Sequence, residues 1–230
     1  STDPFVAGLV GFFAARAAGA AYCVSVHADY DRLENRDMLA RIPFVNFLAK
    51  YIFSRADAVA PISNYLANQV KRNGICSSYM HVIQHGVDTN FFNGVAKSRT
   101  REHLGLPLDI PIVLYVNRLS NQKFCWDALE IASLLENDDA IVVICGDGPE
   151  RKGMETYVMS DARLAHRVIF LGFQSQDNIA ALAAESAVGL VLLAGFGLIE
   201  LCAAGLPVVA YRMEWQGEIV AHEVTGLLVL

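Results

Sequence analysis

The sequence predicts an α/β protein built from two Rossmann-like lobes, each with its own parallel β-sheet. Short apolar runs rich in valine and isoleucine alternate with segments of helical periodicity, which is the pattern of a parallel sheet covered by helices on both faces. Hydrophobic residues make up 54% of the chain and charged residues 18%, enough for a sizeable core. The polar, turn-prone segment Gln84–Lys97 divides the pattern, as a connection between domains does.

Before this segment, short apolar runs predict strands, and the stretches between them fit helices. Three strands make a thin lobe, so we expect sequence to be missing beyond both ends of the chain. The predicted strands are Ala21–Val26, Ala58–Pro61 and His81–Ile83, and the predicted helices lie near Pro4–Ala18, Met38–Ser54 and Ser63–Asn73.

After this segment, strands and helices alternate regularly. Ligands of such sheets bind outside the carboxyl ends of the strands, so the loops after the strands are the candidate sites. The predicted strands are Ile112–Val116, Ile141–Cys145, Val168–Leu171, Gly189–Leu193 and Pro207–Ala210, and the predicted helices lie near Phe124–Leu135, Pro149–Ser160, Asp177–Glu185 and Leu198–Ala204.

We therefore expect a partial amino-terminal lobe over residues 1–90 and a carboxyl-terminal lobe over residues 91–230 whose end is missing. The final apolar run, Leu227–Leu230, stops without closing an element. Phe5–Ala15 is shorter than the roughly 20 residues of a membrane span, and Ser186–Tyr211 is interrupted by polar and helix-breaking residues. No basic segment precedes an apolar stretch at the amino terminus, so we expect no signal peptide.

The net charge of −6 argues against a protein that binds nucleic acid through a basic face. It also provides no general attraction to anionic membranes. The cysteines are spread singly at positions 23, 76, 125, 145 and 202, which favours reduced, buried thiols over disulfides or zinc. The histidines lack metal-ligand spacing, so the sequence predicts no metal site.

The first candidate site is the polar stretch Asn117–Lys123, which follows a predicted strand and leads into a helix. Arg118 can bind a diphosphate through paired hydrogen bonds, and Lys123 as a point charge. The amino terminus of the following helix would add its dipole. The plain alternative is two solvated surface cations.

The second candidate is Ala194–Glu200, between a buried strand and a helix. Gly195 and Gly197 allow a ligand to approach backbone N–H groups closely. Glu200 is the one charge between Ser186 and Tyr211, and a carboxylate in such a setting must be paired or must face a ligand. It could accept hydrogen bonds from a ribose diol, or a nearby partner could satisfy it.

The third candidate is His27, at the carboxyl end of the first strand, where α/β folds place reactive groups. A structural histidine is the alternative. Gly146–Glu150 predicts a strand–helix turn, with Pro149 suited to the first helical position, and resembles a phosphate loop only weakly. His85–Asp88 predicts either a tight turn that fixes the crossing between lobes or a plain connecting loop.

Taken in order, these pieces resemble glycosyltransferase family 4, the retaining, nucleotide-sugar-dependent enzymes of the GT-B fold. The matching stretches cover essentially the whole chain, and they are SVHADYD, RADAVAPISNYL, VIQHGVDTNFF, VNRLSNQK, VICGDGPE, VIFLGF, GFGLIELCAAGLPVVAY and EIVAHEVTGLLV.

The resemblance assigns roles to matching residues. It implies that Arg118 and Lys123 hold the donor diphosphate, that Glu200 binds the nucleotide ribose, and that His27 contacts the donor sugar near the reacting centre. It also places donor-binding backbone at Gly172, Gly195, Phe196 and Gly197.

Two departures from the family pattern stand out. Ala194 occupies the position of the first glutamate of the E-x7-E motif, and the loop to Glu200 is about two residues short. The glycine-rich amino-terminal loop and the carboxyl-terminal helices of the family are not visible. The identity of the donor sugar, and activity itself, depend on these differences.

The resemblance implies a UDP- or GDP-linked sugar donor, a glycan, glycolipid or small-molecule acceptor, and no cofactor or metal. Donor would bind between the lobes, and lobe closure would exclude water. It further implies a cytoplasmic protein with peripheral contact at the inner face of the membrane. A nucleotide-sugar-binding remnant without activity, a scaffold of the same fold, and a phosphorylase or epimerase stay open as alternatives.

Overall fold

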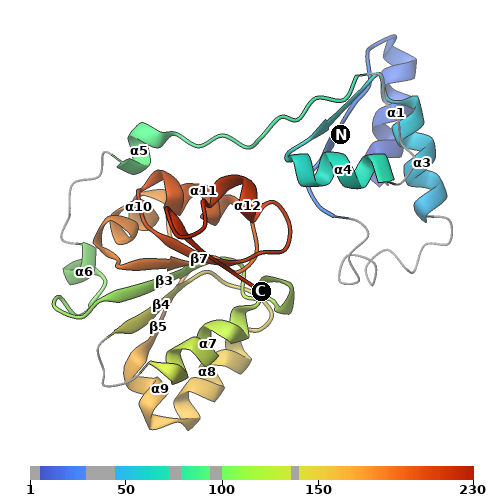
Figure 1. Cartoon of the computed structure of the whole chain (residues 1–230). Helices are drawn as coiled ribbons and strands as arrows, with labels where there is room; N and C mark the ends of the chain where they lie inside the picture. The colour runs from blue at the N-terminus through green and yellow to red at the C-terminus, as the bar shows by residue number, and fades with distance from the viewer. Residues whose placement is uncertain (1–5, 30–44, 73–78, 94–99, 136–139) are drawn as a thin grey trace. The chain divides into compact units, whose positions relative to one another are not determined.

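The computed structural model describes residues 6–29, 45–72, 79–93, 100–135 and 140–230. The chain divides into two compact units, Ser1–His85 and Gly86–Leu230 (Figure 1). The boundary between them falls inside the predicted crossing Gln84–Lys97. That segment is not wholly irregular, because it contains the short helix α5 (Thr89–Asn93).

The amino-terminal unit is built on two parallel strands, β1 (Cys23–Val26) and β2 (Ala58–Pro61), paired in register from Cys23 with Ala58 to Val26 with Pro61. Its helices are α1 (Val6–Ala18), α3 (Val45–Arg55) and α4 (Asn64–Arg72). The first residues of two predicted helices, Pro4–Phe5 and Met38–Phe44, lie outside the described residues.

The predicted strand His81–Ile83 is wrong as a continuous strand, although this segment does lie beside β2. His81 N–H donates to the Val59 carbonyl at 3.1 Å, and Ile83 N–H donates to the Pro61 carbonyl at 2.9 Å. Only the bridge between Val59 and Met80 is regular. The reason is Pro61, which has no N–H to donate back to the segment.

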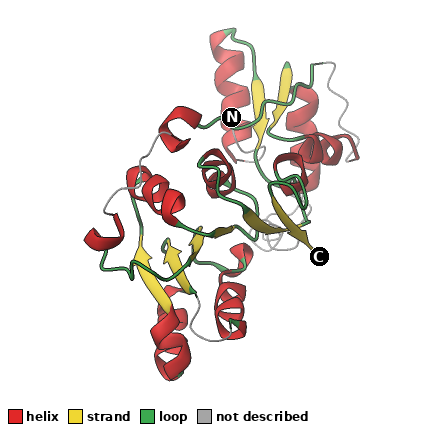
Figure 2. Cartoon of the chain, turned by 60° about the vertical axis from the view of Figure 1, so that its left-hand side comes forward, coloured by secondary structure: helices red, strands yellow, loops and turns green. Residues whose placement is uncertain are grey.

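The carboxyl-terminal unit contains one sheet of six parallel strands in the order β5-β4-β3-β6-β7-β8. Helices cover both of its faces (Figures 1 and 2), with α7, α8 and α9 on one side and α10, α11 and α12 on the other. The strands are β3 (Ile112–Val116), β4 (Ile141–Cys145), β5 (Val168–Gly172), β6 (Val188–Leu190), β7 (Val208–Tyr211) and β8 (Gly226–Val229).

The helices of this unit begin within a few residues of the predicted positions where the pattern was strong. The short ones, α5, α6, α9 and α12, were not predicted, because four to six residues are too few for periodicity to be recognised. Besides α5, the helices described in this unit are α6 (Thr100–His103), η1 (Asn121–Lys123), α7 (Cys125–Leu134), α8 (Arg151–Ser160), α9 (Ala162–Arg167), α10 (Gln176–Glu185), α11 (Phe196–Ala203) and α12 (Gln216–Ile219).

Buried strand residues explain why the sheet forms. All of β4 is buried, as are Ile112–Tyr115 of β3, because helices cover both faces of a parallel sheet. Most of the final apolar run lies in β8, which pairs in parallel with β7, and Leu228 is buried. Strand β6 is shorter than predicted and ends at Leu190, although Val191–Leu193 stay buried.

The cysteines are less uniformly buried than expected. Cys125 and Cys145 are buried, Cys202 is half-buried and Cys23 is exposed, while Cys76 lies outside the described residues. None of the helices within the described ranges combines the length and the apolar character that a bilayer crossing requires.

Candidate functional site

The candidate site lies at the carboxyl edge of the six-stranded sheet. Numbered within the unit, its strand order is 3-2-1-4-5-6, and the chain reverses direction across the sheet between β3 and β6. Open α/β sheets bind ligands at such a switch point, where loops diverge from adjacent strands. The loops that follow β3 and β6 are the two that sequence analysis selected.

Hydrogen bonds to neighbouring strands fix the loop after β3. Asn117 N–H donates to the Cys145 carbonyl at 3.2 Å, and Leu119 N–H donates to the Asp147 carbonyl at 3.0 Å. The Asn117 side-chain amide donates to the Leu193 carbonyl at 3.3 Å. The loop is therefore connected both to the β4 side and to the β6 side of the switch point.

Lys123 is the cation that the fold places at this switch point. Its side chain is half-buried, and Nζ donates to the Ala194 carbonyl at 2.9 Å. A Cβ built on Gly195 would lie 3.6 Å from the same Nζ, so the ammonium lies against the backbone that begins α11. The Tyr115 hydroxyl, from β3, stabilises the turn that contains Lys123 by donating to the Lys123 carbonyl at 3.0 Å.

Arg118 behaves differently. Its side chain is exposed, and no hydrogen bond or ion pair joins the guanidinium to another described residue. Its backbone N–H donates to Asn117 Oδ1 at 2.9 Å. The structure thus holds Lys123 at the switch point and leaves the Arg118 side chain exposed at the surface.

The glycine loop before α11 approaches β3 closely. Gly195 is extended at the start of the helix, with φ 176°, and Phe196 is 56% exposed. A Cβ on Gly197 would lie 2.7 Å from the Val116 carbonyl oxygen, so only glycine fits at this position without a shift of backbone. The amino terminus of α11 therefore lies directly over the end of β3, next to Lys123.

Glu200 lies one turn into α11 and is half-buried. Gln176 Nε2, from the first turn of α10, donates to Glu200 Oε1 at 3.2 Å. The carboxylate thus has a neutral protein partner, which is the structural explanation that sequence analysis weighed against a ribose contact. One carboxylate oxygen can accept from Gln176 and the other from a ligand at the same time.

Gly172, the remaining predicted donor contact in this unit, has a structural explanation of its own. It is buried at the end of β5 with φ +70°, and its carbonyl accepts from Gly146 N–H at 2.8 Å. A Cβ at this position would lie 3.0 Å from Arg151 Nη1. A left-handed backbone next to a guanidinium requires glycine whether or not a ligand binds.

His27, in the amino-terminal unit, follows β1 directly and is half-buried. Its Nδ1 lies 3.2 Å from His85 Nε2, and the ring centroids are 4.9 Å apart. Burial, and then the positive charge that His85 can carry, lower the pKa of His27 below its usual value. The ring is therefore kept neutral near physiological pH.

Glu150 connects two loops of the site, a role that the sequence pattern did not predict. Trp126 Nε1 donates to Glu150 Oε2 at 2.9 Å, and Asn121 Nδ2 donates to Glu150 Oε1 at 3.2 Å. Glu150 thereby holds the turn that contains Lys123 against the loop after β4. The motif Gly146–Glu150 contained the residue, but nothing in the spacing indicated which loop its carboxylate would reach.

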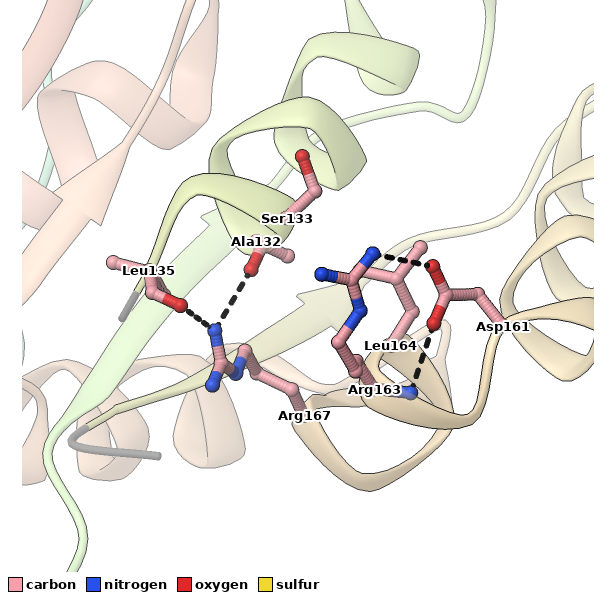
Figure 3. Close-up of a pocket in the computed structure, with 7 residues that line it drawn as sticks. All are labelled: Ala132, Ser133, Leu135, Asp161, Arg163, Leu164 and Arg167. Atoms are coloured by element: carbon pink, nitrogen blue, oxygen red, sulfur yellow. Dashed lines mark hydrogen bonds and ion pairs between the residues drawn. The ribbon is translucent and has the colours of Figure 1, made fainter. Parts of the chain in front are cut away.

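Among the described residues no cluster of three or more histidine, cysteine or acidic side chains could hold a metal ion. A pocket of about 310 Å³ lies at the opposite, amino edge of the sheet, between α7 and α9 (Figure 3). Arg167 donates there to the carbonyls of Ala132 and Leu135 at the end of α7, while Arg163 pairs with Asp161. Arg167 therefore satisfies the last carbonyls of α7. This structural role accounts for the charged side chain in the pocket without a ligand.

Two family sequence models match the chain. The model described as glycosyl transferases group 1 matches residues 96–230, and the one described as glycosyltransferase family 4 matches residues 1–91. The N-acetyl-alpha-D-glucosaminyl L-malate synthase of Bacillus anthracis is 24% identical over 196 residues, which are 83% of this chain and 51% of that protein. The chain thus spans about half the length of this curated relative.

Solved structures show the same fold. Anabaena Alr3699/HepE in complex with UDP has a TM-score of 0.78 and 23% identity, over 97% of this chain and 62% of that one. Sucrose-phosphate synthase from Thermosynechococcus elongatus has a TM-score of 0.79 and 25% identity, over 96% and 57% of the two chains.

Fold and comparisons together define the class of protein: an α/β protein with the Rossmann-like lobes of the GT-B fold, as the sequence predicted. The chain belongs to the glycosyl transferases group 1 family, whose sequence model covers residues 96–230 of its 230 residues.

Proposed function

We propose that the protein containing this chain is a retaining glycosyltransferase that moves a hexosyl group from a nucleotide-diphosphate sugar to a glycan, glycolipid or small-molecule acceptor. The observation that carries the proposal is the position of Lys123. Its ammonium lies at the switch point of a Rossmann-like sheet, against Gly195 and the amino terminus of α11. A positive charge beside backbone N–H groups at a helix start is a favourable site for phosphate oxygens.

In the proposed reaction, the bond between the anomeric carbon of the donor sugar and the diphosphate oxygen breaks. The acceptor oxygen forms the new bond on the same face of the sugar, and its proton passes to an oxygen of the departing diphosphate. Lys123 stabilises the charge that develops on that diphosphate. The exposed side chain of Arg118 adds a second positive charge that binds the same diphosphate. Preorganised charge of this kind is often the largest contribution to catalysis.

Three further roles belong to the proposal. The second carboxylate oxygen of Glu200 accepts a hydrogen bond from the nucleotide ribose. The backbone of Gly195–Gly197, and that of Gly172 at the carboxyl end of β5, contacts the donor. His27 contacts the donor sugar as a neutral imidazole. No metal or cofactor takes part, because the two cations provide the charge that a divalent ion would otherwise supply.

The donor is UDP- or GDP-linked in this proposal. UDP is the nucleotide bound in the similar Anabaena structure, and a neutral Ala194 stands where the family has a glutamate. A methyl group cannot accept a hydrogen bond from a sugar hydroxyl, so any bond that this glutamate accepts from the donor sugar in the family is missing here. We further propose a cytoplasmic protein, in peripheral contact with the inner face of a membrane when its acceptor is a lipid.

A nucleotide panel tests the proposal on the chain itself. UDP or GDP at about a hundredfold above its Kd should stabilise the folded chain by about 2.7 kcal/mol and so raise its melting temperature. UMP, which lacks the second phosphate, should raise the melting temperature less. Arg118→Ala should reduce the difference between UDP and UMP. If neither diphosphate shifts the melting temperature, the donor site assigned to the carboxyl-terminal unit is wrong.

A second candidate, a nucleotide-sugar-binding protein without transfer activity, is favoured by Ala194 and by the pairing of Glu200 with Gln176. Calorimetry and product analysis on the full-length protein separate the two. Donor binding without transfer or hydrolysis would support the binding protein, whereas turnover supports the transferase.

A further inference from the structure

The contact between His27 and His85 joins two segments that lie on opposite sides of β2. His27 follows Val26, which pairs with Pro61 at the end of β2. On the other side, Ile83 N–H donates to the carbonyl of the same Pro61 at 2.9 Å, and His85 comes two residues later. The imidazoles thus meet beyond the end of β2, with Nδ1 of His27 3.2 Å from Nε2 of His85.

The distance between the two rings restricts their protonation. A nitrogen–nitrogen distance of 3.2 Å is a hydrogen bond only if one nitrogen carries a hydrogen and the other presents its lone pair. At least one ring must then be neutral, and each ring is confined to the tautomer that the bond requires. Two imidazolium rings would instead point N–H groups of like charge at each other.

Both rings are half-buried, so water competes less for these nitrogens than it would at the surface. The pKa of His27 is lowered by burial and by His85, in agreement with a neutral His27. Hydrogen bonding to one ring nitrogen determines what the other nitrogen can do, because it sets whether that second nitrogen is a donor or an acceptor.

We propose that His85 is a positioning residue for His27: its Nε2 holds the His27 ring in one orientation and one tautomer, so that the second ring nitrogen of His27 meets the donor sugar with a fixed hydrogen-bonding character. This inference rests on the proposed function, in which His27 contacts the sugar. His85 itself touches no reacting atom in it.

The first test needs no substrate. Long-range nitrogen–proton NMR spectra of the histidine rings report the tautomer of His27 directly. In the chain as it stands, His27 should show a single tautomer. His85→Phe, which keeps a ring but removes the nitrogen, should give a mixture of tautomers, and His85→Gln, whose side-chain amide lies near the position of Nε2, should restore one. His81→Phe, at an exposed histidine of the same segment, is the matched control and should change nothing.

An unchanged His27 tautomer in His85→Phe would overturn the inference whatever the enzyme does. Circular dichroism shows whether each variant is folded. Should His85→Phe fail to fold, the comparison of His85→Gln with His85→Ala decides: loss of the single tautomer in the alanine variant alone supports the inference, and its retention in both overturns it.

The second test uses the full-length protein and its nucleotide sugar. A catalytic contact misplaced by about 1 Å can reduce turnover by about a hundredfold. We expect His85→Phe to lower kcat by about tenfold to a hundredfold with donor KM nearly unchanged, and His85→Gln to recover most of it. In the background of His27→Ala, His85→Phe should have little further effect on kcat.

If His85→Phe lowers kcat by the same factor with and without His27→Ala, the positioning role is overturned. If the unmodified full-length protein transfers no sugar, the proposed function fails, and the NMR result still decides whether His85 orders His27. The two ideas therefore fail separately.

Discussion

Lys123 Nζ donates a hydrogen bond of 2.9 Å to the carbonyl of Ala194, 71 positions further along the chain. This contact connects the loop after β3 to the loop after β6, on either side of the line where the sheet reverses its connections. Because the ammonium has three donor hydrogens, it can retain this carbonyl and still donate to a phosphate. The contact therefore holds the charge in place before a ligand arrives.

Replacing Lys123 separates its catalytic role from its structural one. Lys123→Ala removes the hydrogen bond to the Ala194 carbonyl, for which we expect a loss of about 1 kcal/mol in the free energy of unfolding. In the full-length protein it should reduce kcat by about 10²- to 10³-fold, as the loss of one preorganised donor does. Steady-state kinetics and urea unfolding measure the two effects. Lys152→Ala, at an exposed lysine of α8, should change neither, and near-normal turnover of Lys123→Ala would remove the diphosphate assignment.

Glu200 provides a test of ribose recognition. Glu200→Ala removes both carboxylate oxygens, whereas Glu200→Gln keeps a group that can bond to Gln176 but removes the charge. A hydrogen bond to a charged group contributes about 1.5–3 kcal/mol, so we expect both variants to bind free UDP or GDP about ten- to a hundredfold more weakly. Calorimetry measures this, with Glu130→Gln on the exposed face of α7 as control. Equal affinity in all variants would leave Glu200 as a structural partner of Gln176.

The close approach of α11 to β3 predicts a large effect of one methyl group. In Gly197→Ala the new Cβ would lie 2.7 Å from the Val116 carbonyl oxygen, and overpacking against backbone destabilises by about 1–3 kcal/mol. Gly86→Ala is the matched control, because nothing lies within 4 Å of a Cβ there, and it should stay within about 0.5 kcal/mol. Both tryptophans, Trp126 and Trp215, belong to the carboxyl-terminal unit, so their fluorescence follows its unfolding. Equal stability of the two variants would contradict the packing argument.

The lowered pKa of His27 predicts how stability depends on pH. The usual value is 6.5, and burial followed by the charge of His85 reduces it in the folded chain. As pH falls below about 6.5, the unfolded chain takes up this proton first, so the contribution of His27 to the free energy of unfolding decreases until pH reaches the folded pKa. Above pH 6.5 the contribution is complete. NMR titration of the ring should give a pKa below 6.5; a value equal to or above 6.5 would show that burial does not control His27.

Some of the fold could be read directly from the sequence. The strands Ile112–Val116 and Ile141–Cys145 were predicted with the observed bounds, because a strand buried on both faces is a continuous apolar run. Edge elements were harder. The apolar run of β8 was too short to be recognised without β7 beside it, and Pro61 interrupts the pairing of the segment that contains His81.

The amino-acid sequence by itself determined the α/β class, the alternation of elements and the loops in which candidate residues lie, since these depend on local periodicity and on chain order. Only the tertiary structure decided which side chains meet. It brought Lys123 to Ala194 but left Arg118 exposed, gave Glu200 a partner in Gln176, and placed His85 against His27, 58 positions away. Such contacts depend on strand order and on the register between neighbouring strands, which join residues that no local pattern relates.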